Sequence, residues 1–241
     1  MASSIQFSNI GPIFRREVRS YFNSPVAYVV IIAFLAIVGW FFTDTLFINN
    51  VASLGDVFTW ARIAFLIFIP ALTMRLLAEE KKSGTLELLT TKPVHDVEIV
   101  LGKFLAGWAL VGVALAPTLV YFITVASIGK IDMGPALLGY LGLFLVGGVY
   151  VSIGVLASSL TENQIVAFIL SFFLVFILFM LDKILFFVPA GLASTLEFLS
   201  IDFHFNGMAR GVIDSRNVIY FASLLGLSLM LSTVSLERRK W

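Results

Sequence analysis

Residues 133–161 read MGPALLGYLGLFLVGGVYVSIGVLASSLT, which is 29 consecutive residues without a charge. A helix needs about 20 apolar residues to cross a hydrocarbon core of roughly 30 Å. Four further uncharged runs of this kind occupy residues 20–43, 104–129, 163–181 and 217–236. A sixth run is long enough only if it starts near Val57 and keeps Arg62 close to one interface, where its side chain can snorkel. We therefore expect six spans, at about residues 25–43, 57–78, 104–127, 135–160, 163–181 and 217–236.

The composition supports membrane insertion. Hydrophobic residues make up 59% of the 241 residues, only 13% are charged, and the mean hydropathy is +1.00. Average soluble chains are about one quarter charged, so a soluble globule with this composition would leave much of its surface apolar. The net charge of +1 gives no reason to expect a nucleic-acid partner. We expect an all-α integral membrane protein with a single transmembrane domain over residues 1–241.

The residues that are missing exclude most catalytic chemistry. The chain has no cysteine, which rules out disulfides and thiolate sites, and it has only two histidines. No P-loop, HExxH or GxSxG motif occurs. The spans are almost free of ionisable residues, which argues against a proton-relay transporter or an ion pump. We expect no catalytic residue, cofactor or metal in this chain, and an energy source that lies elsewhere.

Basic residues in the connections indicate the orientation of the spans. With both termini inside, eleven Lys and Arg residues lie inside and four outside, with Arg62 counted as part of a span. Cytoplasmic connections carry an excess of basic residues, so both termini should be cytoplasmic. The first apolar run is too long for a signal-peptide core and has no A-x-A-like cleavage site, so we expect an uncleaved anchor.

The segment before the first span has helical periodicity. Apolar residues, Phe14 among them, fall on one side, and Arg15, Arg16 and Arg19 fall on the other. A basic amphipathic helix beside a span would lie on the cytoplasmic membrane surface, with its apolar side in the headgroup region. It is either an anchor for the first span or an elbow helix that also touches a cytoplasmic partner, and the two can both be true.

The connection at residues 75–103 holds ten of the 31 charged residues. The charged residues at 79–82 would extend the second span into water as a helix, which Gly84 can interrupt. Residues 85–90 can then form a short helix before Pro93. Its leucines, including Leu86 and Leu88, would either dock on another protein or fold back on the ends of the spans.

Two other features leave alternatives open. On the fourth span, Gly148/Ser152 and Gly154/Ser158 have the spacing that lets helices approach closely, within this bundle or across a dimer. After the fifth span, residues 185–199 are apolar but interrupted by proline and glycine, which fits a re-entrant or surface hairpin.

Asp202 and His204 follow this hairpin and have the spacing of a possible metal-binding pair, but no third ligand is placed by the sequence. A polar loop with local ion pairs is the favoured interpretation. Between the fourth and fifth spans, Thr161 and Gln164 have the spacing of a capping box for the fifth helix.

Several motifs resemble those of one known family. They are EEKKSGTLELL at 79–89, KPV at 92–94, IVLGK at 99–103 and ASSLTENQ at 157–164. Together with the six-span layout, they are similar to the membrane permease subunits of type-2 ABC exporters. Within that family, FRREVRSYFNSP at 14–25 and DFHFNGMARGVIDSRNVIYF at 202–221 most resemble the gliding-motility-associated permease subunits. The neighbouring subgroup is the permease of copper-enzyme (nitrous oxide reductase) maturation.

The resemblance implies a permease in a bacterial inner membrane, two copies of a separate ATPase that binds ATP and Mg²⁺, and a second permease half, identical or homologous. It also implies that the short helix in the second connection is a coupling helix, with an element made of Glu79, Glu80, Gly84, Thr85, Leu86, Glu87, Leu88 and Pro93. A non-transporting anchor of a motility or secretion assembly would have the same features. An intramembrane enzyme is poorly supported, with Asp202 and His204 as its last candidates.

Overall fold

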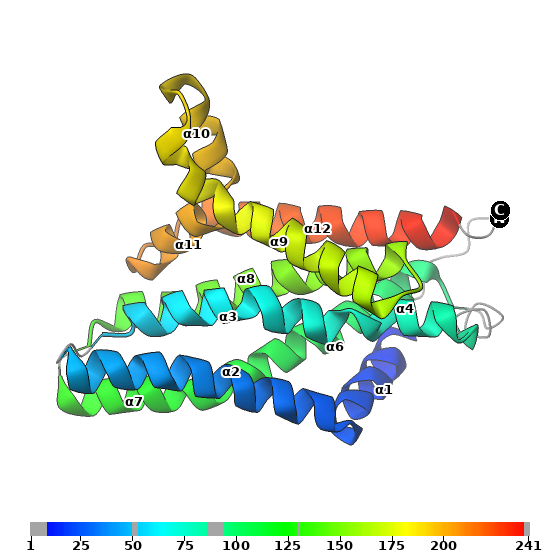
Figure 1. The fold of residues 1–241 in the computed structure, drawn as a ribbon, viewed down its shortest axis with the longest axis horizontal. Helices are drawn as coiled ribbons and strands as arrows, with labels where there is room; N and C mark the ends of the chain where they lie inside the picture. Colours follow the sequence, from blue (N-terminus) through cyan, green and yellow to red (C-terminus); the bar gives the residue numbers. More distant parts are fainter. Residues whose placement is uncertain (1–8, 50–52, 86–93, 130, 239–241) are drawn as a thin grey trace.

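The computed structural model describes residues 9–49, 53–85, 94–129 and 131–238. Within these residues all regular structure is helical (Figure 1). The long helices are α2 (Pro25–Thr43), α3 (Gly55–Thr73), α6 (Asp96–Leu115), α8 (Met133–Leu160), α9 (Gln164–Ile184) and α12 (Ser215–Glu237). The shorter ones are α1 (Ile10–Asn23), α4 (Arg75–Lys82), α7 (Leu119–Ile128), α10 (Ala190–Leu199) and α11 (Ile201–Ala209), with single turns at Asp44–Ile48, Ala116–Thr118 and Leu185–Phe187.

Six helical stretches are long and apolar enough to cross a membrane, which confirms the predicted number of spans. They are Pro25–Ile48, Gly55–Lys82, Asp96–Ile128, Met133–Leu160, Gln164–Ile184 and Ser215–Glu237. Most extend beyond the predicted bounds, because a helix can continue into charged residues after the apolar run has ended. The chain is an all-α, multi-pass membrane protein.

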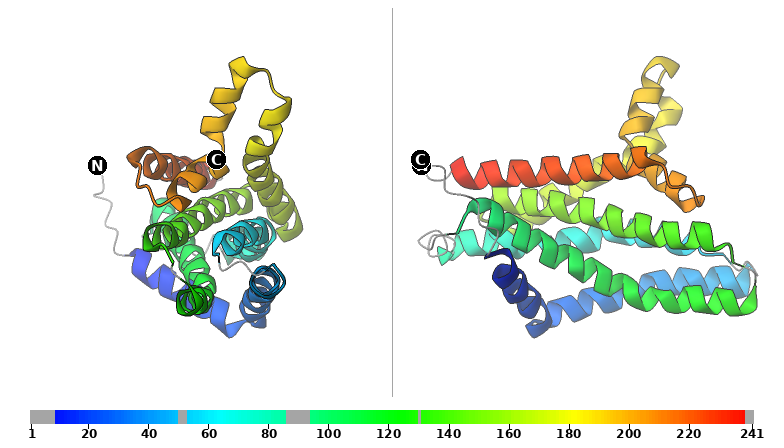
Figure 2. Two further views of the ribbon diagram at one scale, coloured as in Figure 1. Left: turned by 90° about the vertical axis from the view of Figure 1, so that its left-hand side faces the viewer. Right: turned by 180° about the vertical axis from the view of Figure 1, so that it is seen from behind.

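Helix α8 is the central helix of the bundle. Its most apolar window is 78% buried, against 22% for the corresponding windows of α9 and α12. It packs against α3, α6, α9, α11 and α12, so four of the five other spans lie directly against it, whereas α2 packs on α3 (Figures 1 and 2). The uncharged stretch at 133–161 therefore forms the core to which the rest of the fold attaches.

The small residues of α8 allow this close packing. A Cβ atom at Gly148 would lie 2.8 Å from Nε1 of Trp108, which donates a hydrogen bond of 2.8 Å to the carbonyl of Phe144. Gly154 faces the side chain of Thr73 on α3 in the same way, and Ser152 is fully buried. The small residues of the fourth span are thus used inside this bundle, which resolves the alternative left open by their spacing.

Two short helices connect the fifth and sixth spans, where we expect a re-entrant or surface hairpin. Helix α10 projects away from the bundle, whereas α11 packs against α8 (Figure 2). Ile201, Phe205 and Met208 are the buried apolar residues of α11, and the ring of Phe205 lies against Gly142 of α8. Residues 185–199, where we expect the hairpin, therefore form a turn and the projecting helix α10, and the following helix α11 is fixed to the core.

The prediction that Arg62 snorkels to an interface is wrong. Its side chain is only 8% exposed, and its Nη1 lies 2.5 Å from Oδ1 of Asp202 on α11. The guanidinium carbon lies 4.1 Å from the centre of the Phe205 ring, and Nζ of Lys183 lies 2.9 Å from the other oxygen of Asp202. Arg62 stays inside because a buried carboxylate balances its charge and an aromatic ring covers it.

The favoured interpretation of Asp202 and His204 as members of a polar loop with local ion pairs is wrong. Both residues are buried on helix α11, and Asp202 pairs with Arg62, which is 140 positions away in the sequence. Nδ1 of His204 lies 2.8 Å from Oδ1 of Asn217, and Nε2 lies 2.8 Å from the carbonyl oxygen of Phe198. Asp202 and His204 thus have separate partners. Over the described ranges, no group of three or more potential metal ligands occurs.

The Arg62–Asp202 pair generates a stability prediction. Asp202→Asn should lower the free energy of unfolding by about 3–5 kcal/mol, because it leaves the buried Arg62 charge without a counter-charge. Asp182→Asn is the matched control, because it removes another carboxylate partner of Lys183. The Lys183 side chain is 50% exposed, so this change should lower the free energy of unfolding by less than about 1 kcal/mol. Unfolding in mixed detergent–SDS micelles measures both. Equal losses for the two variants would contradict the role assigned to the buried pair.

Candidate functional site

Helices α1 and α4, the start of α6 and the end of α12 lie at one end of the bundle (Figure 1). This end receives most of the residues that the sequence singles out. Glu79 and Glu80 lie on α4, Gly84 and Thr85 follow it, and the four elbow residues Phe14, Arg15, Arg16 and Arg19 lie on α1. Leu86, Glu87, Leu88 and Pro93 of the predicted coupling element lie outside the described residues.

Helix α1 confirms the predicted N-terminal helix, but its apolar side faces the protein. It lies across the end of the bundle (Figures 1 and 2), with Ile13 and Tyr21 buried. Ile13 sits over Gly102 of α6, where a Cβ atom would come within 2.6 Å of its Cγ2. The hydroxyl of Tyr21 donates a hydrogen bond of 3.1 Å to the carbonyl of Leu72. The prediction that this side lies in the headgroup region is therefore wrong for these residues, because Gly102 leaves room for the helix to dock on α6.

One buried carboxylate caps both α1 and α6. Oε2 of Glu98 accepts hydrogen bonds from the backbone N–H of His95 at 2.9 Å and from Nδ2 of Asn9 at 3.1 Å. Its Oε1 accepts from the backbone N–H of Asn9, also at 3.1 Å. These bonds satisfy groups at the N-terminal ends of both helices. The contact between Asn9 and Glu98 has no sequence signal, whereas the spacing of His95 and Glu98 is that of a capping box.

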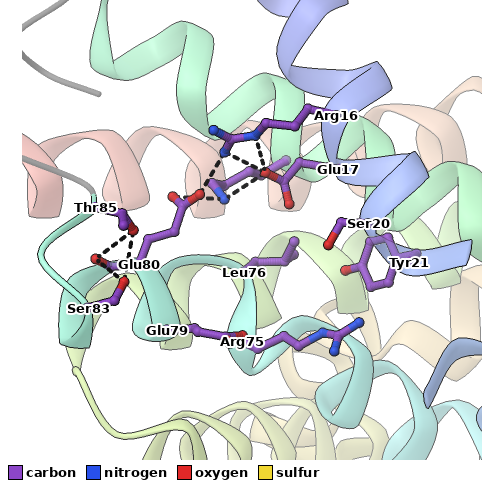
Figure 3. A pocket seen from close by; sticks show the side chains of 11 residues that line it. Arg16, Glu17, Ser20, Tyr21, Arg75, Leu76, Glu79, Glu80, Ser83 and Thr85 are labelled. Atoms are coloured by element: carbon purple, nitrogen blue, oxygen red, sulfur yellow. Dashed lines mark hydrogen bonds and ion pairs between the residues drawn. The ribbon is translucent and has the colours of Figure 1, made fainter. Parts of the chain in front are cut away.

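Four charged side chains join α1, α4 and α6, and we call them the charge cluster: Arg16, Glu17, Glu80 and Lys103. Nζ of Lys103 lies 3.2 Å from Oε1 of Glu17 and 3.0 Å from Oε2 of Glu80. Nη2 of Arg16 lies 2.8 Å from Oε1 of Glu17 and 2.6 Å from Oε1 of Glu80 (Figure 3). Two cations and two carboxylates thus alternate around the cluster and balance each other.

Burial distinguishes the two cations of the charge cluster. The Lys103 side chain is 1% exposed, so its ammonium depends on the two carboxylates for the solvation that it has lost. The Arg16 side chain is 50% exposed. Burial lowers the pKa of Arg16, but the carboxylates of Glu17 and Glu80 raise it by more, so the net shift is upward. Arg16 therefore stays charged and closes the cluster on its outer side.

The two predicted acidic coupling residues differ in orientation. Glu80 is turned inward to Lys103 and Arg16, so it holds α4 against its neighbours. Both glutamates line an open cavity of about 370 Å³ between α1 and α4 (Figure 3). Glu79 is exposed and makes no ion pair with the described residues, so of the two it is the carboxylate that another molecule can reach.

The hydroxyl of Ser158 fixes the start of α4 on the core helix α8. Its Oγ accepts hydrogen bonds from the backbone N–H groups of Leu77 at 3.0 Å and Ala78 at 2.9 Å, and it donates to the carbonyl of Met74 at 2.9 Å. The first N–H groups of a helix have no partner within the helix. Ser158 therefore replaces the backbone partners that are lost where α3 gives way to α4.

The end of α4 follows the sequence prediction. Gly84 has a φ of +69°, a left-handed conformation that glycine adopts without steric cost, and the helix ends at Lys82. Nζ of Lys81 donates to the carbonyl of Ser159 at the end of α8. Helix α4 is thus an arm of eight residues that is tied to α1, α6 and α8 and leads directly into the segment at 86–93.

The predicted capping box between the fourth and fifth spans is wrong. Asn163 caps α9, with its Oδ1 accepting from the backbone N–H of Ile165 at 2.9 Å. Thr161 instead accepts a hydrogen bond from the N–H of Asn163. Either residue type can cap a helix, and Asn163 is the one that directly precedes the first helical turn.

Comparison with known proteins identifies the type of chain. The model of a protein family described as "ABC-2 family transporter protein" matches residues 17–235. This range includes all six membrane-spanning stretches almost entirely, and with them three of the helices that meet at the charge cluster end. A search of curated proteins found no match.

Ser158 generates a prediction with a close control on the same helix. Ser158→Ala should lower the free energy of unfolding by about 2–4 kcal/mol, because two buried N–H groups lose their acceptor. Ser152 is equally buried, but its Oγ donates only to the carbonyl of Val149 on its own helix. Ser152→Ala should therefore lower the free energy of unfolding by about 1 kcal/mol or less. Chemical unfolding in detergent measures both, and a Ser158→Ala variant as stable as the Ser152→Ala variant would argue against the bridge.

The charge cluster generates a second prediction. Lys103→Gln leaves the carboxylates of Glu17 and Glu80 facing each other without their shared cation, so α1 should separate more readily from α4. We expect amide hydrogens of α1 to exchange at least about tenfold faster, equivalent to about 1.4 kcal/mol. Lys82→Gln on α4 is the control, because Lys82 is exposed and makes no ion pair among the described residues. Unchanged exchange in Lys103→Gln would show that the cluster does not hold α1.

Proposed function

The chain belongs to the ABC-2 family of transporter proteins and is the membrane-spanning permease subunit of an ABC transporter, and we propose that it converts ATP-driven closure of a separate ATPase into movement of its own helices. The observation that carries this proposal is the attachment of α4. The arm that leads into the predicted coupling helix contacts three other helices through polar groups, of which Lys103 and Ser158 are buried, so a force applied at residues 86–93 would reach the whole bundle.

The geometry of α4 supports this route in two steps. Laterally, the charge cluster connects α4 to α1 and α6, and Ser158 connects it to α8. Along its axis, α4 continues α3, which lies in the bundle core beside α8. A push on the tip of α4 would therefore displace α1 and the second, third and fourth spans together, rather than bend a free loop.

We assign the contact with the ATPase to Leu86 and Leu88, which would fill an apolar cleft on that subunit, and to Glu79 and Glu87, which would meet basic groups beside it. ATP and Mg²⁺ would bind to the ATPase, present in two copies, and a second permease half would complete the transporter. This chain would contribute no catalytic residue and no cofactor. The excess of basic residues at the end that carries α1 and α4 supports a cytoplasmic position for this end, in a bacterial inner membrane.

We further propose that the transporter is an exporter of the gliding-motility-associated type. The support is the likeness of residues 14–25 and 202–221 to that subgroup, with the copper-enzyme maturation permeases as the alternative. Both stretches also contain residues that hold the fold together. The first forms most of α1, and the second contains Asp202 and the buried polar pair His204 and Asn217. The remaining alternative is a non-transporting anchor of a motility or secretion assembly. Reconstituting the complex and measuring ATP-dependent flux separates the two, because an exporter would support flux and an anchor would not.

The proposed docking generates a prediction on complex formation. Replacing Leu86 and Leu88 together with Asp should reduce co-purification of the ATPase at least tenfold, because charged groups would have to enter an apolar cleft. Ile213→Asp provides the control, since Ile213 is 71% exposed and lies between α11 and α12, away from α4. Undiminished association of the double variant would refute the proposed docking site.

A further inference from the structure

Helix α1 has an outward side that the charge cluster does not use. Its inward side buries Ile13 and Tyr21, and Arg16 is committed to Glu17 and Glu80. Arg15 and Arg19 are exposed, and neither makes an ion pair or hydrogen bond with any of the described residues. They are four residues apart on a helix, so their side chains project from the same side.

A shallow, open groove lies on the outward surface of α1, and the described residues that line it all belong to this helix or are Ser24. Arg15, Arg16, Arg19, Ser20 and Asn23 contribute hydrogen-bond donors to the lining, and Phe14 and Val18 contribute apolar groups. None of these described lining residues carries a carboxylate. It therefore combines two uncompensated guanidinium groups with polar donors and an apolar wall, and it fits a ligand that has an anionic head and an apolar body.

The position of the groove indicates where such a ligand comes from. Helix α1 lies at one end of the bundle, at an angle to the long helices (Figures 1 and 2). Ser24, with φ −102° and ψ 136°, then turns the chain into α2, which begins at Pro25 and is apolar throughout. Arg19 is thus less than two helical turns from the first membrane-spanning residue. Because α2 is long and apolar enough to cross a membrane, the groove lies next to the point where the chain would enter the bilayer.

We propose that this groove binds an anionic phospholipid, with Arg15 and Arg19 contacting its phosphate. Guanidinium groups can donate two parallel hydrogen bonds to a phosphate, so two arginines on one side of a helix form a specific anion clamp. Ser20 and Asn23 supply further donors for the headgroup. The apolar wall and the start of α2 accommodate the first carbons of an acyl chain, which a soluble anion or an acidic protein surface would leave unused.

Native mass spectrometry of the full chain, purified in detergent and exposed to equal amounts of phosphatidylglycerol and phosphatidylcholine, tests the proposal. The wild-type chain should retain phosphatidylglycerol in preference to phosphatidylcholine. The Arg15→Gln/Arg19→Gln variant should lose this preference about thirtyfold, since each of the two basic residues near an anionic membrane surface contributes roughly 1 kcal/mol. The control is Arg210→Gln/Arg216→Gln, which removes two exposed arginines near the α11–α12 connection and should retain the lipid as the wild type does.

Three outcomes would overturn the lipid assignment. The first is equal phosphatidylglycerol retention by Arg15→Gln/Arg19→Gln and wild type. The second is displacement of the lipid by soluble glycerol phosphate at the same concentration, which would identify a site for free phosphate. The third is unchanged lipid retention with loss of the ATPase from the complex, which would assign this side of α1 to an acidic protein surface. Because both arginines are exposed, the double variant should unfold at the same denaturant concentration as the wild type, and Arg15→Lys/Arg19→Lys should restore part of the preference.

Discussion

The buried ammonium group of Lys103 constrains the end of the bundle where coupling is proposed. A lysine side chain that is 1% exposed is tolerated only where carboxylates replace the water that it has lost. Here the two carboxylates come from different helices, Glu17 on α1 and Glu80 on α4. The electrostatic requirement of one side chain on α6 therefore holds three helices together, and Arg16 closes the arrangement on its exposed side. Neither α1 nor α4 can move away from α6 without removing a carboxylate from the buried ammonium group of Lys103.

The second span connects this cluster to the region of the hairpin. The helical stretch Gly55–Lys82 carries Glu80 at one end and Arg62 toward the other, and each is paired with an ion on a different helix. Arg62 pairs with Asp202 of α11, which also meets Lys183 at the end of α9. Between these points, the stretch packs against the glycine-rich side of α8 and is fixed by Ser158 at the join of α3 and α4. The same stretch is thus in contact with the proposed coupling segment and with the hairpin, which makes it a route for movement between them.

Five uncharged runs and a sixth apolar run that contains Arg62 were sufficient to predict the number of spans and the all-α fold, because the length of an apolar helix is set by the thickness of the bilayer. The helical period at residues 10–23 and the glycine at 84 likewise predicted α1 and the end of α4. The sequence did not predict the partners of Arg62, Lys103 or Glu98, since a hydrogen bond or ion pair between residues 89 or 140 positions apart leaves no local pattern. For the same reason it assigned the apolar side of α1 to lipid: periodicity shows that a helix has an apolar side, but not whether protein or membrane covers it. The hydrogen bonds of Ser158 to α4 were not predicted either, because the small size of this residue already explained its place in a closely packed helix without a role for its hydroxyl.

Distance measurement between spin labels on α1 and α4 tests most directly whether these helices transmit movement as one body. The chain has no cysteine, so Ser20→Cys and Lys82→Cys introduce two unique labelling positions, both exposed. In the complex with its ATPase, we expect a single narrow distance distribution that is the same without nucleotide and with trapped ATP. A distribution that shifts or splits when ATP is trapped would contradict rigid coupling through the charge cluster, because α4 would then be moving independently of α1.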